Sequence, residues 1–197
     1  MENSHRKIKI ITGEGKQVTS NDLVKLILRN LSWRQKLNPK VTNDMVAGSI
    51  SSRKIHYQPF WIAKVLVFAS RHPFPPKTAP YVVFVDAVSG YRGLMSHVPH
   101  IQEIMPLEDA IIIEPVIDQP EDALRYVFDV QYKQINRLYL LKKPEQKVKE
   151  IGLYHLPFWR VSVRNDYYSK DFMFNANTGE NESYLMSIWD KGELVKL

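Results

Sequence analysis

The sequence contains no cysteine and no long hydrophobic run. Without cysteine there is no disulfide framework, no thiolate metal site, no iron–sulfur cluster and no cysteine nucleophile. The longest nearly uncharged apolar run, residues 62–70, is interrupted by Lys64 and is far too short to cross a bilayer as a helix. The first twelve residues are too charged for the apolar region of a signal peptide. We therefore expect a soluble, cytoplasmic protein, which can also be peripheral to a membrane.

Motifs of common enzymes are also missing. The sequence has no dinucleotide-binding glycine fingerprint, no His-Glu-x-x-His and no Gly-x-Ser-x-Gly. The segment 13–16, Gly-Glu-Gly-Lys, comes nearest to a phosphate-binding loop, but it lacks the loop's spacing and hydroxyl residue, which favours an ordinary loop tip. His97 and His100 are spaced for one ion, but Pro99 argues against a helix that would align them. We expect no catalytic residue, no metal site and no cofactor.

Charge is unevenly distributed along the chain. Residues 1–54 carry eleven Lys and Arg against four acidic residues, whereas residues 101–129 carry one basic residue against eight acidic ones. These segments can attract each other across an interface, steer a charged partner, or simply form solvated faces.

Two short motifs occur twice in the same order. Residues 56–61 read HYQPFW and residues 154–159 read YHLPFW, an offset of 98. Residues 84–90 read FVDAVSG and residues 173–179 read MFNANTG, an offset of 89. Pro-Phe-Trp is a rare tripeptide, so recurrence in register indicates duplication. We predict two α+β repeats in tandem, 1–100 and 101–197.

Each repeat is expected to begin with a strand and a helix. Short strands are predicted at 8–11 and 110–113. Residues 20–28 then resemble residues 120–128 at an offset of 100, and both segments have apolar side chains at helical spacing. The predicted inward residues are Leu23, Ile27 and Leu31 in the first helix and Ala123, Val127 and Val130 in the second.

Antiparallel strands are expected to follow each helix. The β-rich segments are 60–68, 81–87, 158–163 and 171–176. A third strand is predicted at Leu94-Met95 and at Leu185-Met186. The proline-rich segment 72–80 predicts irregular structure, and additional short helices are possible at 42–52 and 144–151.

The paired turns carry a family resemblance. Asp86-Ala-Val-Ser-Gly90 and Asn175-Ala-Asn-Thr-Gly179, each following a helix and lying between strands, resemble the PepSY family of small domains. The resemblance covers about 40 residues at the end of each repeat. It implies a cystatin-like unit, in which a helix packs on a curved antiparallel sheet, and a binding or inhibitory role without catalytic residues. From the residues themselves, Asp86 is expected to bond backbone amides within its turn.

Aromatic and basic residues are the candidate binding residues. Tryptophan combines a large surface with an N–H donor, which suits interfaces and pockets, but a repeated aromatic pair can equally form the core beneath a helix. Basic side chains after each main helix can contact phosphates of nucleic acid or anionic lipid, or remain solvated. The candidates are Phe60, Trp61, Phe158, Trp159, Arg34, Lys142 and Lys143.

Three functions remain open from these observations. The first is a non-catalytic binding or assembly module whose two similar halves bind a protein partner or a small ligand. The second is a peripheral binder of nucleic acid or anionic membrane that uses the basic segments. The third is an enzyme with a cleft between the halves and carboxylates from residues 103–129. The absence of a legible acid–base pair favours the first.

Overall fold

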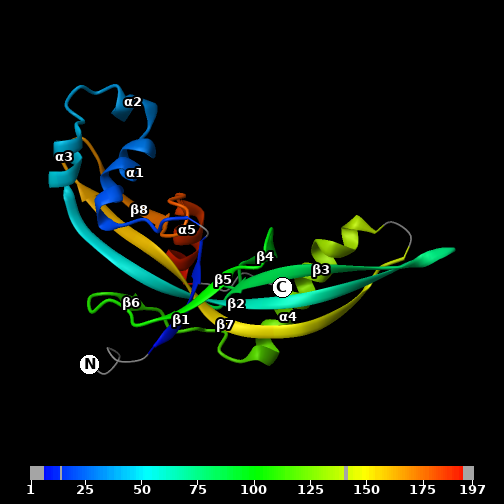
Figure 1. Cartoon of the computed structure of the whole chain (residues 1–197). Coiled ribbons are helices and arrows are strands. Elements are labelled where there is room, and N and C mark those ends of the chain that lie inside the picture. The colour runs from blue at the N-terminus through cyan, green and yellow to red at the C-terminus, as the bar shows by residue number, and fades with distance from the viewer. Residues whose placement is uncertain (1–6, 14, 140–141, 193–197) are drawn as a thin grey trace. The chain divides into compact units, whose positions relative to one another are not determined.

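The computed structural model describes residues 7–13, 15–139 and 142–192. Its fold is mixed α and β with mostly antiparallel strands, which confirms the predicted α+β class (Figure 1). The strands are β1 (Ile8–Thr12), β2 (Ile50–Arg71), β3 (Phe74–Asp86), β4 (Arg92–Met95), β5 (His100–Ile104), β6 (Ile111–Ile112), β7 (Glu145–Arg164) and β8 (Ser169–Asn175).

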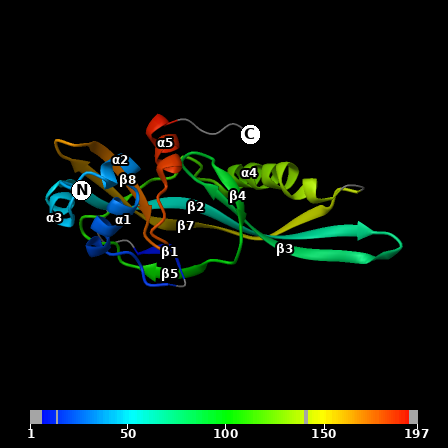
Figure 2. The same ribbon diagram turned by 90° about the horizontal axis from the view of Figure 1, so that it is seen from above.

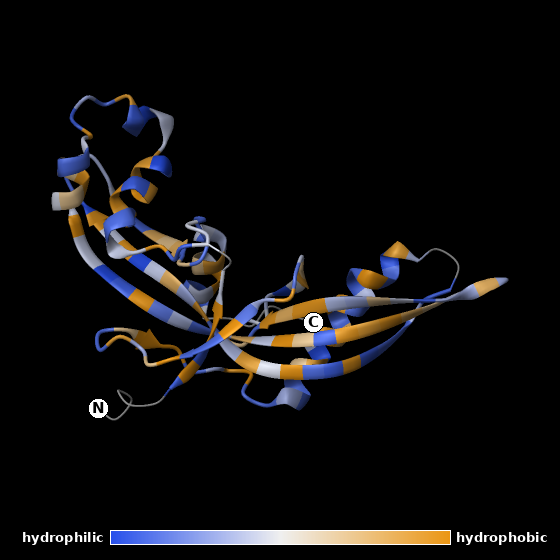
Figure 3. Ribbon diagram, viewed as in Figure 1, coloured by the Kyte–Doolittle hydropathy of each residue, from blue (hydrophilic) through white to orange (hydrophobic). Residues whose placement is uncertain are grey.

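The helices of the described part are α1 (Leu23–Arg29), α2 (Trp33–Lys36), α3 (Asn43–Gly48), α4 (Pro120–Lys133) and α5 (Ser183–Lys191), with 3-10 turns η1 (Ser20–Asp22) and η2 (Ile135–Leu138). Hydrogen-bonded strands follow the order β4-β3-β2-β7-β1-β5, while β6 pairs with β2 and β8 pairs with β7. Hydrophilic and hydrophobic bands alternate along much of the long strands β2 and β7, as expected for strands whose successive side chains point to opposite faces (Figure 3).

The chain forms two compact units, and each draws on both halves of the sequence. Unit 1 contains β1, α1, α2, α3, β5, β6, β8 and α5, with β2 up to Tyr57 and β7 from Leu156. Unit 2 contains β3, β4, α4 and η2 with the remaining parts of β2 and β7. The ranges 1–100 and 101–197 therefore stay a prediction about repeated sequence; they are not the compact units.

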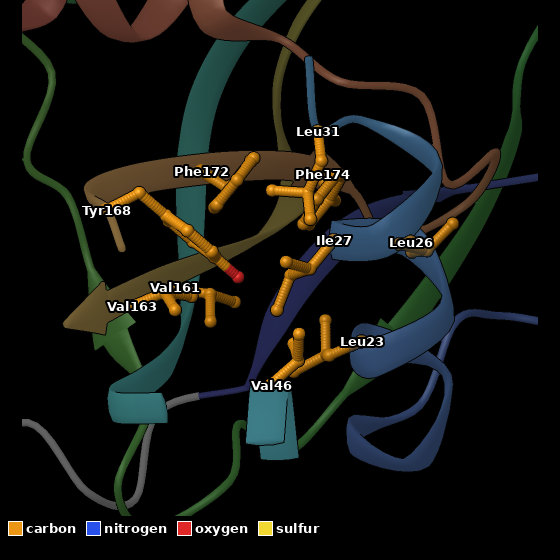
Figure 4. Close-up of a cluster of buried hydrophobic side chains, with 10 residues drawn as sticks. All are labelled: Leu23, Leu26, Ile27, Leu31, Val46, Val161, Val163, Tyr168, Phe172 and Phe174. Carbon is orange, nitrogen blue, oxygen red and sulfur yellow. The ribbon is translucent and has the colours of Figure 1, made fainter. Parts of the chain in front are cut away.

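The main core of unit 1 lies between α1 and the hairpin of β7 and β8. Leu23 and Ile27 of α1 are fully buried with Phe172 and Phe174 of β8. Figure 4 shows these side chains gathered with others from the same elements and with Val46 of α3. The helix belongs to the first half of the sequence and the hairpin to the second.

The main core of unit 2 combines a helix and a hairpin from the opposite halves of the sequence. Helix α4, from the second half of the sequence, packs Ala123, Val127 and Val130 onto the hairpin of β2 and β3, from the first half. Trp61 and Val85 of that hairpin are buried in the same cluster, and Figure 2 shows α4 running alongside these strands. The predicted inward faces of both helices are thus buried, but each covers the hairpin of the other half.

Three local predictions are wrong. Residues 145–151 are strand, because β7 begins at Glu145 with alternating exposed and partly buried side chains. Leu185-Met186 lies in α5, where Asn181 Oδ1 accepts hydrogen bonds from both the N–H and the hydroxyl of Ser183 at the helix start. The proline-rich segment is also strand from Phe74 onward, since this part of β3 pairs with β2 and with no other strand among the described residues, and prolines are tolerated on such an edge.

Candidate functional site

Both units build the same connection between a hairpin and the segment that leads into its helix. In unit 2 the indole N–H of Trp61 donates to the carbonyl of Ile117 at 2.7 Å. In unit 1 the indole N–H of Trp159 donates to the carbonyl of Val18 at 2.8 Å. Each acceptor lies just before a helix, so each tryptophan ties its hairpin to a helix from the other half of the sequence.

The two turns are matched in their backbone hydrogen bonds as well. Gly90 N–H donates to the Asp86 carbonyl and Gly179 N–H to the Asn175 carbonyl, both at 2.8 Å. These glycines have φ of +72° and +71°, a conformation that other L-residues rarely adopt. The side chains also match: Asp86 Oδ1 accepts the N–H two residues ahead at 3.0 Å, and Asn175 Oδ1 does so at 2.9 Å.

The aromatic candidates lie in the cores of both units. Phe60, Trp61 and Phe158 have exposed fractions of 4%, 6% and 0%, whereas Trp159 is partly buried. A buried side chain offers little surface to a partner, and the indole donors already have carbonyl acceptors. These positions favour the core role, which was one of the two interpretations of these residues.

The basic candidates are exposed but belong to different units. Arg34 of α2 in unit 1 places its guanidinium 5.4 Å from the centre of the Trp33 ring. Lys142 and Lys143 belong to unit 2, and the Lys143 ammonium donates to the carbonyls of Asn136 and Tyr139 at 3.0 Å each. Lys143 therefore caps the end of η2, a local structural role that the sequence pattern did not indicate.

Among the described residues, no three His, Asp or Glu side chains are grouped closely enough to hold an ion. Glu103, three residues after His100 in the sequence, forms an ion pair with Lys7 at 3.2 Å.

An exposed apolar stripe on α4 is the feature most suited to a partner. Leu124, Phe128 and Tyr132, four residues apart, lie on one side of the helix, which we call the α4 stripe. Leu124 is partly buried, while Phe128 and Tyr132 have exposed fractions of 49% and 75%. The sequence carried this signal as a second apolar series, offset by one residue from the buried Ala123 and Val127.

The corresponding side of α1 is covered. An offset of 100 pairs Val24 with Leu124 and Leu28 with Phe128, and both α1 residues are partly buried against the unit 1 core. Helix α3 packs against α1 and contributes the fully buried Val46. Between α4 and β7 the described chain contains only η2, so unit 2 has no counterpart of α3.

No family model matches the chain, and no curated protein or solved structure proved similar to it. Within the described residues, every helix is too short or too polar to span a membrane.

Proposed function

We propose that this chain is a non-catalytic binding or assembly module made of two similar halves, and that it binds a protein partner through the α4 stripe. The observation that carries the proposal is a contrast in exposure: Val24 and Leu28 of α1 are partly buried against a core that includes Val46 of α3, whereas Phe128 and Tyr132 of α4 are exposed. Exposed aromatic side chains on a fixed helix are typical anchors of protein interfaces.

The halves are best explained as a tandem duplication of a helix-on-antiparallel-sheet, cystatin-like unit. The helices of the two copies are exchanged, so that each helix packs on the hairpin of the other copy. The matched tryptophan bonds and the matched glycine turns support this origin. The exchange leaves each repeat dependent on the other for its core.

Unit 1 suggests the chemistry of the partner. There a short helix, α3, packs against α1 and adds Met45 and Val46 to the core on which Val24 and Leu28 lie. Exposed Asp118 and Glu121 lie at the start of α4, so opposite charge favours a basic flank on the partner. The expected partner segment is a short amphipathic helix with small apolar side chains and basic neighbours.

The test places a photo-crosslinking amino acid at position 128 of the full chain in the cells that make it. Position 122, exposed on another side of α4, is the matched control. The partner recovered at 128 is then purified, and its affinity is measured for the chain and for Phe128→Ala and Tyr132→Ala. Loss of a central aromatic anchor should weaken binding by about tenfold or more. An equal yield at 122 and 128, or an affinity that neither substitution changes, contradicts the proposal.

A second candidate function, binding to an anionic membrane, is favoured by α2. Trp33 and Leu37 have exposed fractions of 67% and 72%, and the exposed cations Arg34, Lys36 and Lys40 lie next to them in the sequence. An apolar pair flanked by cations suits the boundary between headgroups and acyl chains. Flotation with vesicles of anionic lipid should retain the chain at low salt, lose it steeply as salt rises, and lose it on Trp33→Ala. Retention by neutral vesicles to the same extent contradicts this function.

A further inference from the structure

Unit 1 contains a pocket lined by an excess of positive charge. Its volume is about 260 Å³, and it lies between the loop before α1, one side of α1 and the turn at Gly179. The loop contributes Lys16, and α1 contributes Lys25 and Arg29, which are four residues apart and so share a side of the helix.

One of the cations is fixed and the other two are available. Arg29 Nη2 donates to the Gly179 carbonyl at 2.9 Å. Neither Lys16 nor Lys25 forms an ion pair or a side-chain hydrogen bond with any other residue in the described ranges. Like charges gathered around one pocket repel each other, and an anion placed among them relieves that repulsion.

The lining also includes one carboxylate, that of Asp22. Its Oδ2 accepts hydrogen bonds from the backbone N–H and the hydroxyl of Thr19, both at 2.8 Å. These bonds, together with the charges of Lys16 and Lys25, hold the pKa of Asp22 below its usual value. Asp22 is therefore ionised and held by Thr19, and the charged lining keeps a net excess of two positive charges.

The equivalent place in unit 2 is filled and neutralised. Tyr126 stands where unit 1 has Leu26, and its ring lies so close to the turn that a Cβ added to Gly90 would be 2.7 Å from it. Arg92 lies over this ring at 5.1 Å and donates to the Gly90 carbonyl at 2.8 Å, as Arg29 does to Gly179. Asp129, at the position of Arg29, forms an ion pair with Arg92 at 2.7 Å.

The charge on Asp129 completes this neutralisation. Burial would raise the pKa of its carboxyl group, but hydrogen bonds and charge from Lys133 and Arg92 outweigh burial and lower it. Unit 2 thus places a tyrosine ring and an ion pair where unit 1 has space and, among the described residues, two lysines without an ion pair. Because unit 2 has the same arrangement without a pocket, the fold alone does not explain why cations gather around the pocket of unit 1.

We propose that the unit 1 pocket binds a small multivalent anion carrying phosphate or carboxylate groups. Lys16 and Lys25 contact the anion as mobile point charges, and Arg29 adds a third cation held in place by the turn. The volume lies slightly below the roughly 300–1,000 Å³ of pockets for drug-sized ligands, which fits a ligand of few heavy atoms. This site is separate from the α4 stripe, so either proposal can fail alone.

The experiment titrates the full chain with sodium pyrophosphate and, separately, with sodium citrate, at constant ionic strength in a buffer free of both. Isothermal titration calorimetry reports the affinity, and the two arms distinguish phosphate from carboxylate chemistry. We expect saturable binding of at least one anion with one site per chain. Lys16→Gln and Lys25→Gln should each weaken it by about tenfold, because each removes a charged contact.

Two further variants make the test decisive. Arg125→Gln removes an equally placed cation from α4 in unit 2 and should leave binding unchanged. Leu26→Tyr imitates unit 2 by filling the pocket, and should abolish binding while circular dichroism shows an intact fold. Absence of saturable binding by both anions, or an equal loss in Arg125→Gln and Lys25→Gln, overturns the proposal.

Discussion

Units 1 and 2 both contain a hairpin packed against a helix, but they differ in what lies beside the helix and beside the turn. Each ties a hairpin to a helix through a tryptophan, and in each a turn with a left-handed glycine follows the second strand of the hairpin. In unit 1, α3 packs against the helix, the side chains of Val24 and Leu28 are partly buried, and a cationic pocket lies beside the turn. Unit 2 leaves the helix flank open and fills the turn region with Tyr126 and Arg92. The bonds common to both units hold a hairpin to a helix, and the differences mark the places where we propose that each unit binds.

Replacing the two tryptophans should have the largest effect. Trp61→Ala removes a nearly fully buried side chain and leaves the Ile117 carbonyl without its donor, which should lower the free energy of unfolding by about 3–5 kcal/mol. Trp159→Ala should cost less, because Trp159 is only partly buried. Urea denaturation followed by circular dichroism measures both. Equal losses would mean that the two units do not differ in core burial as described.

Exchanging the matched turn residues Asp86 and Asn175 should lower stability by less than loss of Trp61, and by different amounts in the two units. Asp86 is fully buried and accepts hydrogen bonds from Gln58, Val88 and Ser89. Asp86→Asn replaces the Oδ2 that accepts the Ser89 hydroxyl with an NH2 group and leaves a neutral oxygen for Gln58 and Val88, which weakens these hydrogen bonds at a cost of about 1–3 kcal/mol. Asn175→Asp keeps the oxygen that accepts the Asn177 N–H and should cost less. The same denaturation experiment measures the order, and a larger loss for Asn175→Asp would reverse the comparison.

Replacing each turn glycine by alanine should give a smaller difference in stability between the two units than the turn exchange above. Both substitutions force alanine into a left-handed conformation, which costs about 1–2 kcal/mol. Gly90→Ala should cost more, because its new Cβ would lie 2.7 Å from the Tyr126 ring, against 3.2 Å from Leu26 for Gly179→Ala. The double variants with Tyr126→Leu and Leu26→Tyr provide the check, since exchanging these neighbours should reverse the order of melting temperatures.

The smallest expected effect concerns Glu182 of unit 1. Burial, and then the nearby charge of Glu180, raise the pKa of its carboxyl group above the usual value. Such a group binds its proton more tightly when folded, so stability falls as pH rises from the unfolded pKa through the folded one. Glu182→Gln should therefore raise the melting temperature slightly at pH 7 and leave it unchanged at pH 3. A shift of equal size at both pH values would exclude titration of Glu182 as the cause.

The sequence predicted the parts of the fold that depend on local patterns. The apolar spacing of Leu23, Ile27, Ala123 and Val127 identified both main helices and their buried faces. It did not predict the exchange, because both hairpins present similar apolar faces and local patterns do not say which helix covers which hairpin. It also missed the first part of β7, where lysines and glutamates alternate with residues that are only partly buried.

The candidate sites were harder to predict than the fold. The repeated tryptophans drew attention because they are rare, yet their conservation between the halves reflects shared packing. The α4 stripe and the pocket depend on what is missing beside a helix, namely an α3 counterpart in unit 2 and a large aromatic ring in unit 1. Such absences arise from the packing of distant segments and leave little trace in local sequence.

The packing of each main helix on a hairpin from the other half of the sequence also determines the order in which the chain can mature on the ribosome. Helix α1 ends at Arg29, but the strand that buries its apolar face ends at Asn175. At ordinary elongation rates the nascent helix waits on the order of ten seconds for that strand. The hairpin of β2 and β3 likewise waits for α4, so the newly made chain presents two uncovered apolar surfaces at once, and chaperones are expected to occupy them during synthesis.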